Sequence, residues 1–492
     1  MHKLTKTNFI QYLNCPESLW LFKNKPNEYP KGEFSLFLEK LIEEGYEVEA
    51  FAQELFPHSI ELPDFGSSEL TKQEIEKGKT CFFQATFKTE KGAFARIDIL
   101  EKKEDGTWHI YEVKSSTSVK KDKKHNHIKD ACFQKHAMIE NGYLVSQVSI
   151  IHLNKEYVRS GEINPNDLLV VEDISEKVDE IYSEVVNEIN GAINLINKNS
   201  IDESSCSCKE NTRSNHCDSF KYFNPTVGDY SIYEIGRISV KKVKELLDLG
   251  VLKINDIPDN YKLNDKQQLQ FASVRKNAPL IDKKEIENKF SKLNFPLHFI
   301  DYETYASAVP RIDGVKPHQH IPFQVSIHTM QKDGSIEHFE FLANALELPN
   351  KLVDFMKAST GATGTFISWH ASFEKSRNKD MMTMVSGSEP YLEYMNTHMF
   401  DLEDIFKLDY VDYRFHGSTS IKKVLPVLLP ELSYNDLEVQ NGTMALDTWG
   451  RMVLDPNFAE DKNETRKNLL SYCELDTWAM VEMYRVLVEL SK

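Results

Sequence analysis

The sequence lacks any hydrophobic run that approaches the roughly 20 apolar residues needed to cross a lipid bilayer. Its first 20 residues also lack an apolar core followed by the small residues of a secretory cleavage site. These two absences argue against a membrane-embedded or secreted protein. We therefore expect a cytoplasmic protein with no membrane partner.

An excess of positive charge is also missing. The 492 residues include 59 Lys and Arg against 76 Asp and Glu, which gives a formal net charge of −17. This balance argues against a protein that coats nucleic acid non-specifically. It does not exclude a nuclease, in which metal ions and local lysines face the phosphates. With 40% hydrophobic and 27% charged residues, the chain has the composition of a globular protein of two or three domains.

Cysteines are few and unevenly placed. Three of the seven stand alone in apolar patterns, as small buried side chains do: Cys81, Cys132 and Cys473. Cys206, Cys208 and Cys217 instead cluster in the polar stretch SSCSCKENTRSNHCDSF. In a cytosolic chain such a cluster indicates a metal more than a disulfide. Cys15 is the best candidate for a fourth ligand, His216 competes with it, and free thiols in a loop are the alternative.

The segment HIYEVKSS, residues 109–116, places two opposite charges on one predicted strand. Glu112 and Lys114 are two residues apart, so their side chains share a face. Asp98 stands between two isoleucines in a preceding strand of the same predicted meander, whose runs are 82–88, 93–100 and 108–114. Two carboxylates and a lysine can hold a divalent cation and orient a water. A solvated edge strand is the alternative for the charge pair taken alone.

This arrangement resembles the core of the PD-(D/E)XK nucleases, with the family's Asp at Asp98 and its E-x-K at Glu112 and Lys114. HIKDACFQKHAMIENGY resembles the helix that follows in the RecB-type branch, with Gln134 at that branch's glutamine. The resemblance implies Mg²⁺ or Mn²⁺ held by Asp98 and Glu112.

Three further features bear on this resemblance. The acidic segment EEGYEVEAFAQELFP offers Glu44 and Glu47 as another metal ligand. The lysine run 120–124 is either a phosphate contact or a solvated loop. RecB-type nucleases of CRISPR adaptation join one early and three late cysteines around an iron–sulfur cluster. The similar layout here implies a 4Fe–4S cluster on Cys15, Cys206, Cys208 and Cys217, but the C-x-C-x8-C spacing departs from the commoner one and keeps zinc open.

The pattern of elements predicts an α/β protein of three parts. Residues 1–222 would be the PD-(D/E)XK, restriction-endonuclease-like domain, 223–290 a helical connector and 291–492 a second domain. Expected helices and strands of the first part are helix 8–23, helix 33–56, the meander, the Gln134 helix, strand 143–154 and helix 172–199. The connector resembles a helix-hairpin-helix, and a plain spacer is the alternative.

The second domain carries another acidic pattern. In FPLHFIDYETYAS, Asp301 and Glu303 share one strand face. A later strand, in GTFISWHASFEKSR, runs into a polar turn with Glu374. In the predicted helix NLLSYCELDTWAMVEMYRVL, Tyr472 and Asp476 are one turn apart.

This pattern resembles the DEDD exonucleases of the RNase H-like (DnaQ-type) fold. It consists of a strand with D-x-E, a later turn with an acidic residue and a late helix with Y-x3-D. The resemblance implies that four carboxylates bind two cations and that Tyr472 orients the water: Asp301, Glu303, Glu374 and Asp476. Glu374 departs from the aspartate that the family normally has. FHGSTSIKKVLPVLLPELSYNDL further resembles uncharacterised bacterial proteins that join the two domains, and its Lys422 and Lys423 either meet a nucleic-acid backbone or only begin a helix.

The sequence thus predicts a bacterial metal-dependent nuclease with two candidate active sites. DNA with single-stranded ends is the favoured substrate over RNA, and repair or phage-defence proteins are the expected partners. The alternative is a nucleic-acid-binding adaptor or scaffold in which one site is degenerate.

Overall fold

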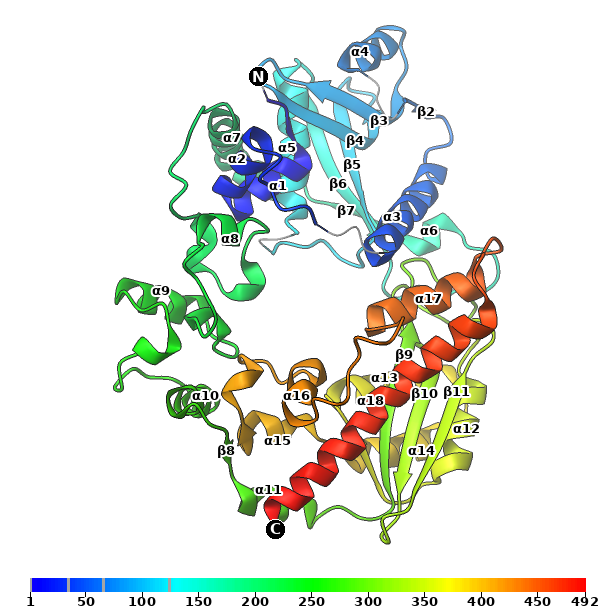
Figure 1. Ribbon diagram of the computed structural model, residues 1–492. Helices are drawn as coiled ribbons and strands as arrows, with labels where there is room; N and C mark the ends of the chain where they lie inside the picture. Colours follow the sequence, from blue (N-terminus) through cyan, green and yellow to red (C-terminus); the bar gives the residue numbers. More distant parts are fainter. Residues whose placement is uncertain (1, 33–35, 64–66, 123–124) are drawn as a thin grey trace. The chain divides into compact units, whose positions relative to one another are not determined.

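A computed structural model describes residues 2–32, 36–63, 67–122 and 125–492, drawn in Figure 1. The chain forms two compact units. The first comprises Met1–Val227 with Ala308–Pro310, and the second comprises Gly228–Ser307 with Arg311–Lys492. Most of the segment 223–290, expected as a connector, therefore belongs to the second unit.

The first unit is built on a mixed sheet. Its described strands are β1 (Leu4–Thr5), β2 (Ile60–Glu61), β3 (Cys81–Lys88), β4 (Ala93–Lys102), β5 (Trp108–Lys114), β6 (Val145–Leu153) and β7 (Leu169–Asp173). Their order is β2-β3-β4-β5-β6-β7, and β1 pairs with β4. β3, β4 and β5 form the antiparallel meander, β6 runs parallel to β5, and β7 closes the edge antiparallel to β6.

Helices cover this sheet (Figure 1). The helices of the first unit are α1 (Lys6–Asn14), α2 (Pro16–Asn24), α3 (Leu36–Glu54), α4 (Ser68–Glu76), α5 (His127–Glu140), α6 (Pro165–Leu168), α7 (Ser175–Ile196) and α8 (Phe220–Phe223), with 3-10 turns η1 (Ser207–Glu210) and η2 (Arg213–Asn215). α5 packs against α7 and the sheet, and Phe133 of α5 stacks on Phe9 of α1. One buried apolar cluster joins these elements.

Two expected helices differ from those observed. The helix predicted over 8–23 is two helices, because Pro16 disfavours helical backbone at Cys15, which is extended with φ −159° and ψ 101°. The helix predicted over 172–199 begins at Ser175, because the residues before it form the edge strand β7. Residues 33–35 of the expected helix 33–56, and 123–124 of the lysine run, lie outside the described residues.

The second unit contains another mixed sheet. Its strands are β9 (Leu297–Tyr305), β10 (Ile321–Met330), β11 (Ile336–Leu342), β12 (Thr365–Ser368) and β13 (Met399–Asp401), in the order β11-β10-β9-β12-β13. β10 runs antiparallel to both of its neighbours, and β12 runs parallel to β9 and β13. A separate pair, β8 (Leu280–Ile281) and β14 (Tyr410–Val411), lies outside this sheet.

The second unit has helices on both faces of its five-stranded sheet and other helices that lie away from it. They are α9 (Val240–Asp248), α10 (Asp265–Lys276), α11 (Lys283–Phe290), α12 (Asn350–Thr360), α13 (Ser372–Met384), α14 (Glu389–Thr397), α15 (Glu403–Leu408), α16 (Ile421–Leu428), α17 (Gly442–Leu454) and α18 (Lys462–Ser491), with 3-10 turns η3 (Ile232–Glu234), η4 (Ile254–Asp256) and η5 (Tyr413–Phe415). α18 packs along β9 and β10.

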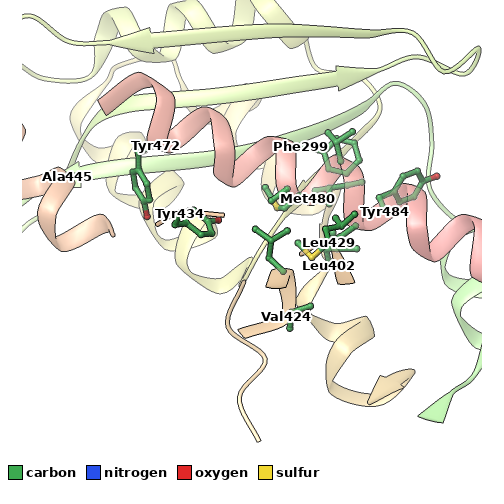
Figure 2. Close-up of a cluster of buried hydrophobic side chains, with 14 of the residues drawn as sticks. Phe299, Leu402, Val424, Leu429, Tyr434, Ala445, Tyr472, Met480 and Tyr484 are labelled. Atoms are coloured by element: carbon green, nitrogen blue, oxygen red, sulfur yellow. The ribbon is translucent and has the colours of Figure 1, made fainter. Parts of the chain in front are cut away.

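Strand alternation gives this sheet two apolar cores. Phe299 of β9 faces the cluster that contains Val424 of α16 and Met480 of α18, shown in Figure 2. Ile300, the next residue, faces the cluster built with α12, α13 and α14. Because residues two apart share a face, Asp301 and Glu303 follow Phe299 toward α18. None of the described helices is both long and apolar enough to span a membrane.

Candidate functional sites

Three carboxylates meet between β9 and α18. Asp301, Glu303 and Asp476 each offer an oxygen, and these oxygens all lie within 4.8 Å of one another. Glu303 and Asp476 are each only 7% exposed. Two come from one strand face and the third from the helix that covers it, as the sequence pattern predicts. Carboxylate oxygens are the ligands that Mg²⁺ and Mn²⁺ prefer.

Burial and mutual repulsion make this group costly when all three are ionised. Burial, followed by the charge of Asp476, raises the pKa of Glu303 to about 8. The same two causes raise the pKa of Asp301 well above its usual range. Burial raises the pKa of Asp476 to about 6. A bound cation would remove this cost, because it favours the charged form of each group.

Two tyrosines, drawn in Figure 2, lie against the carboxylate of Asp476. Tyr434 donates a 2.5 Å hydrogen bond from its Oη to Oδ1 of Asp476, and Tyr472 hydrogen-bonds the same carboxylate. Burial and the charge of Asp476 raise the pKa of both phenols, so both remain protonated donors. Tyr472 was expected from its spacing. Tyr434 was not, and the only sequence signal was its place in the segment SYNDL.

Lys422, at the start of α16, lies beside the same group. Its Nζ is 5.4 Å from the ring centre of Tyr434 and 5.7 Å from that of Tyr472. Its charge lowers the pKa values of Glu303 and Asp476, although burial outweighs it. Lys422 is exposed, as is its neighbour Lys423. One expected lysine therefore lies close to the carboxylates.

Glu374 is buried but stands apart from the close group of three. It lies in the first turn of α13, where the sequence predicts a polar turn, and is 2% exposed. Burial raises its pKa to about 8, and its own charge raises the pKa of Asp301. Its Oε2 has no hydrogen-bond partner among the described residues. Glu374 therefore acts on Asp301 electrostatically from outside the set of oxygens within 4.8 Å.

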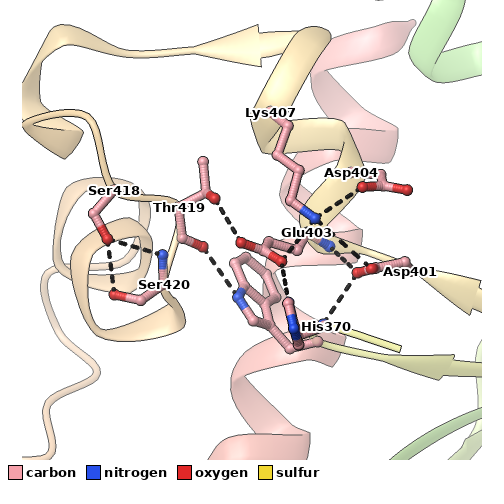
Figure 3. Close-up of polar contacts among 9 residues, drawn as sticks. His370, Asp401, Glu403, Asp404, Lys407, Ser418, Thr419 and Ser420 are labelled. Atoms are coloured by element: carbon pink, nitrogen blue, oxygen red, sulfur yellow. Dashed lines mark hydrogen bonds and ion pairs between the residues drawn. The ribbon is translucent and has the colours of Figure 1, made fainter. Parts of the chain in front are cut away.

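A polar network holds the turn that precedes Glu374 (Figure 3). His370 has left-handed backbone, φ 70°, which is strained for a non-glycine residue. Its N–H donates to Oδ1 of Asp401 at 3.1 Å, and its Nδ1 lies 3.1 Å from Oε2 of Glu403. Glu403 also accepts from Thr419 and pairs with Lys407 at 2.8 Å. These contacts fix where α13 begins.

The first unit contains the residues predicted for the PD-(D/E)XK nuclease site. Glu112 is 1% exposed, and its Oε1 lies 2.5 Å from the ammonium groups of both Lys114 and Lys6. Its Oε2 accepts a hydrogen bond from Gln134, which is fully buried. Although burial opposes it, the charges of Lys114 and Lys6 lower the pKa of Glu112. Glu112 is thus an ionised carboxylate at neutral pH.

Asp98 lies next to Glu112 on the neighbouring strand. Its Oδ2 accepts from the backbone N–H of Val113 at 2.8 Å. Burial, followed by the charge of Glu112, raises the pKa of Asp98 to about 8. Asp130 of α5 completes the group, since its Oδ2 lies 2.7 Å from Lys114 and 3.7 Å from Lys6. Lys6 and Asp130 were not anticipated from the sequence.

The acidic helix α3 approaches this site through Glu49. Glu44 pairs with Lys40 on its own helix, whereas the charge of Glu49 contributes to the raised pKa of Asp98. Gln84 donates to Glu49 and has φ 59° inside a strand. The neighbours of Gln84 pair with the two isoleucines that flank Asp98, since Phe83 pairs with Ile99 and Ala85 with Ile97. A strained, buried amide at this point is a feature that sequence patterns do not show.

The four cysteines named from the sequence also converge. The Sγ atoms of Cys15, Cys206, Cys208 and Cys217 all lie within 4.8 Å of one another. Cys206 and Cys208 are 3.3 Å apart, and Cys208 and Cys217 are 3.2 Å apart. Cys15 occupies the break between α1 and α2, and the others lie around η1 and η2. His216 is outside this group, with its ring stacked on Phe220.

The donor chemistry and spacing fit a metal. Four thiolates in tetrahedral array around one Zn²⁺, with bonds of about 2.3 Å, lie about 3.8 Å apart. In a four-iron cluster each thiolate binds a different iron, so the sulfurs stand farther apart. Amide groups also point at the sulfurs, since Asn224 donates to Cys206 at 3.2 Å and the Cys217 N–H to Cys208 at 3.3 Å. This buried four-cysteine group can bind a metal.

Comparisons with known proteins concern part of the chain. It is 30% identical over 274 residues to "Uncharacterized protein MG366 homolog" of Mycoplasma pneumoniae, covering 51% of this chain and 39% of that protein. It is 24% identical over 229 residues to "Uncharacterized protein MG366" of Mycoplasma genitalium, covering 42% and 34%. The chain thus spans less than two fifths of these relatives. Residues 298–420, which include Asp301, Glu303 and Glu374, match the family described as "Domain of unknown function (DUF2779)".

Proposed function

We propose that the chain is a metal-dependent nuclease whose second unit hydrolyses phosphodiester bonds. The observation that carries the proposal is the convergence of Asp301, Glu303 and Asp476 within 4.8 Å in a buried site. Without cations such a group is destabilising, and no lysine or arginine forms an ion pair with it among the described residues. A mixed sheet covered on both faces, with carboxylates on its first strand and last helix, agrees with the RNase H-like resemblance.

The residues of this site have distinct proposed roles. Two Mg²⁺ or Mn²⁺ ions would stabilise the attacking and leaving oxygens of the phosphodiester. Asp301, Glu303 and Asp476 would bind these ions. Tyr434 and Tyr472 hold the Asp476 carboxylate, and Lys422 adds positive charge where a phosphate would approach.

The first unit offers a second nuclease site of the PD-(D/E)XK type. Asp98 and Glu112 would bind a cation, Lys114 would stabilise charge on the phosphate, and Gln134 orients Glu112. Lys6 and Lys114 both pair with Oε1 of Glu112, and only Lys114 has a role in the PD-(D/E)XK resemblance. Binding of a cation there therefore requires the Lys6 ammonium to withdraw from Glu112.

The experiment offers labelled single- and double-stranded DNA and RNA to the purified chain with Mg²⁺, Mn²⁺ or a chelator. We expect cleavage only with metal, DNA with single-stranded ends to be the preferred substrate, and Asp301→Ala to remove stepwise products. Glu337→Ala, a change of an exposed carboxylate on β11, is the matched control. Metal-independent cleavage, or activity unchanged by Asp301→Ala and by Asp98→Ala, would overturn the proposal.

A second candidate function is a nucleic-acid-binding adaptor or scaffold for repair or defence proteins. It is favoured by the position of Glu374 outside the close group of three carboxylates. An adaptor would bind labelled DNA equally well with metal or chelator and would yield no products under either condition.

For the cysteine group we propose a structural metal, with a 4Fe–4S cluster and a single Zn²⁺ as the two candidates. The resemblance favours the cluster, whereas the sulfur spacing is closer to that around one ion. Iron and acid-labile sulfide in protein purified without oxygen would identify the cluster. One equivalent of zinc would identify the single ion.

A further inference from the structure

A pair of histidines lies away from both carboxylate sites, on the sheet of the second unit. His328 of β10 and His338 of β11 are directly opposite each other in the strand pairing. Their rings are nearly parallel, at 15°, with centres 4.2 Å apart. Glu474 of α18 lies beside them, and one donor atom from each of the three residues lies within 4.8 Å of the others.

Each imidazole has one nitrogen engaged by a hydroxyl. Nδ1 of His328 is 2.9 Å from Oγ1 of Thr477, and Nε2 of His338 is 3.0 Å from Oγ of Ser326. The two hydroxyls are themselves 2.7 Å apart. The other nitrogen of His338, Nδ1, faces Oε1 of Glu474 at 3.7 Å. A hydrogen bond that fixes one ring nitrogen and leaves the other for a ligand is the arrangement usual for metal-binding histidines.

The exposure of the group also suits a ligand, because His328 is buried at 4% exposed while the other two side chains are open to solvent. The side chains of His338 and Glu474 are 24% and 50% exposed, which gives an ion access from solvent. Glu474 and Asp476 are two residues apart on a helix, so they project in different directions.

We infer that His328, His338 and Glu474 form a separate binding site for a transition-metal dication such as Zn²⁺. Two imidazoles and one carboxylate are a donor set that Zn²⁺ takes, with a water at the fourth position, whereas Mg²⁺ prefers all-oxygen sites. Such an ion would tie α18 to β10 and β11. Because Tyr472 and Asp476 are on the same helix, it would hold those residues against the sheet.

The test measures Zn²⁺ equivalents retained by the 492-residue chain after chelator treatment, reloading and gel filtration. His338→Ala should retain one equivalent fewer than the wild type. Glu474→Gln should raise the dissociation constant of that equivalent at least tenfold. Glu337→Gln is the matched control, because it alters a carboxylate on the same strand with its side chain on the opposite face.

Equal zinc content in the wild type, His338→Ala and Glu474→Gln would overturn the inference and leave only a His338–Glu474 ion pair. Circular dichroism verifies that each variant is folded. If His338→Ala does not fold, the zinc content of Glu474→Gln, a change at an exposed residue, tests the inference instead. The inference is independent of nuclease activity. Asp301→Ala should keep this equivalent, and an inactive wild-type protein should bind it all the same.

Discussion

At the scale of single residues, the second unit gathers carboxylates that resist ionisation. The pKa of Glu303 is about 8 in the folded chain, against about 4.3 for an unfolded glutamate. Between these values the folded state holds a proton that the unfolded state has released. Stability from this group is therefore present below about pH 4.3 and is lost as the pH rises to about 8.

Because stability from Glu303 falls as the pH rises, we can make a prediction for the metal-free protein. In chelator, the midpoint of thermal unfolding should fall as the pH rises from 5 to 8, and Mg²⁺ or Mn²⁺ should reverse the fall. Glu303→Gln should flatten the dependence, because the amide does not ionise, while Glu337→Gln should leave it unchanged. An equal slope in the wild type and Glu303→Gln would contradict the raised pKa.

Tyr434 provides a second prediction at this scale. Its hydrogen bond to Asp476 favours the ionised carboxylate, and a hydrogen bond to a charged group contributes about 1.5–3 kcal/mol. Tyr434→Phe should therefore shift the acidic limb of the pH–rate profile upward by about one to two units. Tyr484→Phe, on the same helix as Asp476 but in the apolar core, is the control (Figure 2). A profile that does not move would remove Tyr434 from the site.

At the scale of elements, local pattern predicted most strands and the long helices. Alternation located β4, β5 and β9, and so placed Asp98, Glu112, Asp301 and Glu303 on their faces. Pro16 is a sequence signal for the break between α1 and α2. The break was not predicted, because the residues on both sides have helical periodicity. The start of the predicted helix 172–199 overlapped the end of the short edge strand β7. Five residues are too few for strand alternation to be distinguished from helical periodicity.

What the sequence could not supply is partners brought together by tertiary packing. Lys6 reaches Glu112 from 106 positions away, and Tyr434 reaches Asp476 from 42. Neither has a local motif of its own. The strained backbone of Gln84 and His370 is likewise set by neighbours in space. Such residues become visible only when the elements are assembled.

The cysteine group links elements that are distant in sequence, and this leads to the third prediction. Cys15 joins the start of the first unit to the turns around 206–217. Cys15→Ala should lower metal content and loosen α1 and α2, because metal-binding energy is partly folding energy. Metal analysis and hydrogen exchange of residues 6–24 measure both effects. Cys81→Ala, outside the group, should change neither, and unaltered metal in Cys15→Ala would refute the shared centre.

At the scale of the whole molecule, each compact unit has its own mixed sheet, its own core and its own acidic site. Because the two acidic sites belong to separate units, the effects of mutations in them should add. Asp98→Ala should abolish the cuts assigned to the first unit and leave stepwise products in place. Asp301→Ala should do the reverse, and only the double variant should be inactive.

Product patterns on end-labelled DNA measure this separation, with Glu90→Ala in the β3–β4 turn as the control for the first unit. If Asp98→Ala alone removes all cleavage, the second unit does no hydrolysis, and its carboxylates serve to bind metal and nucleic acid. If Asp301→Ala alone removes all cleavage, Lys6 keeps cations from Glu112, and Lys6→Ala should then restore activity to the first site. Lys6, which shares Oε1 of Glu112 with Lys114, thus decides whether the chain has one active site or two.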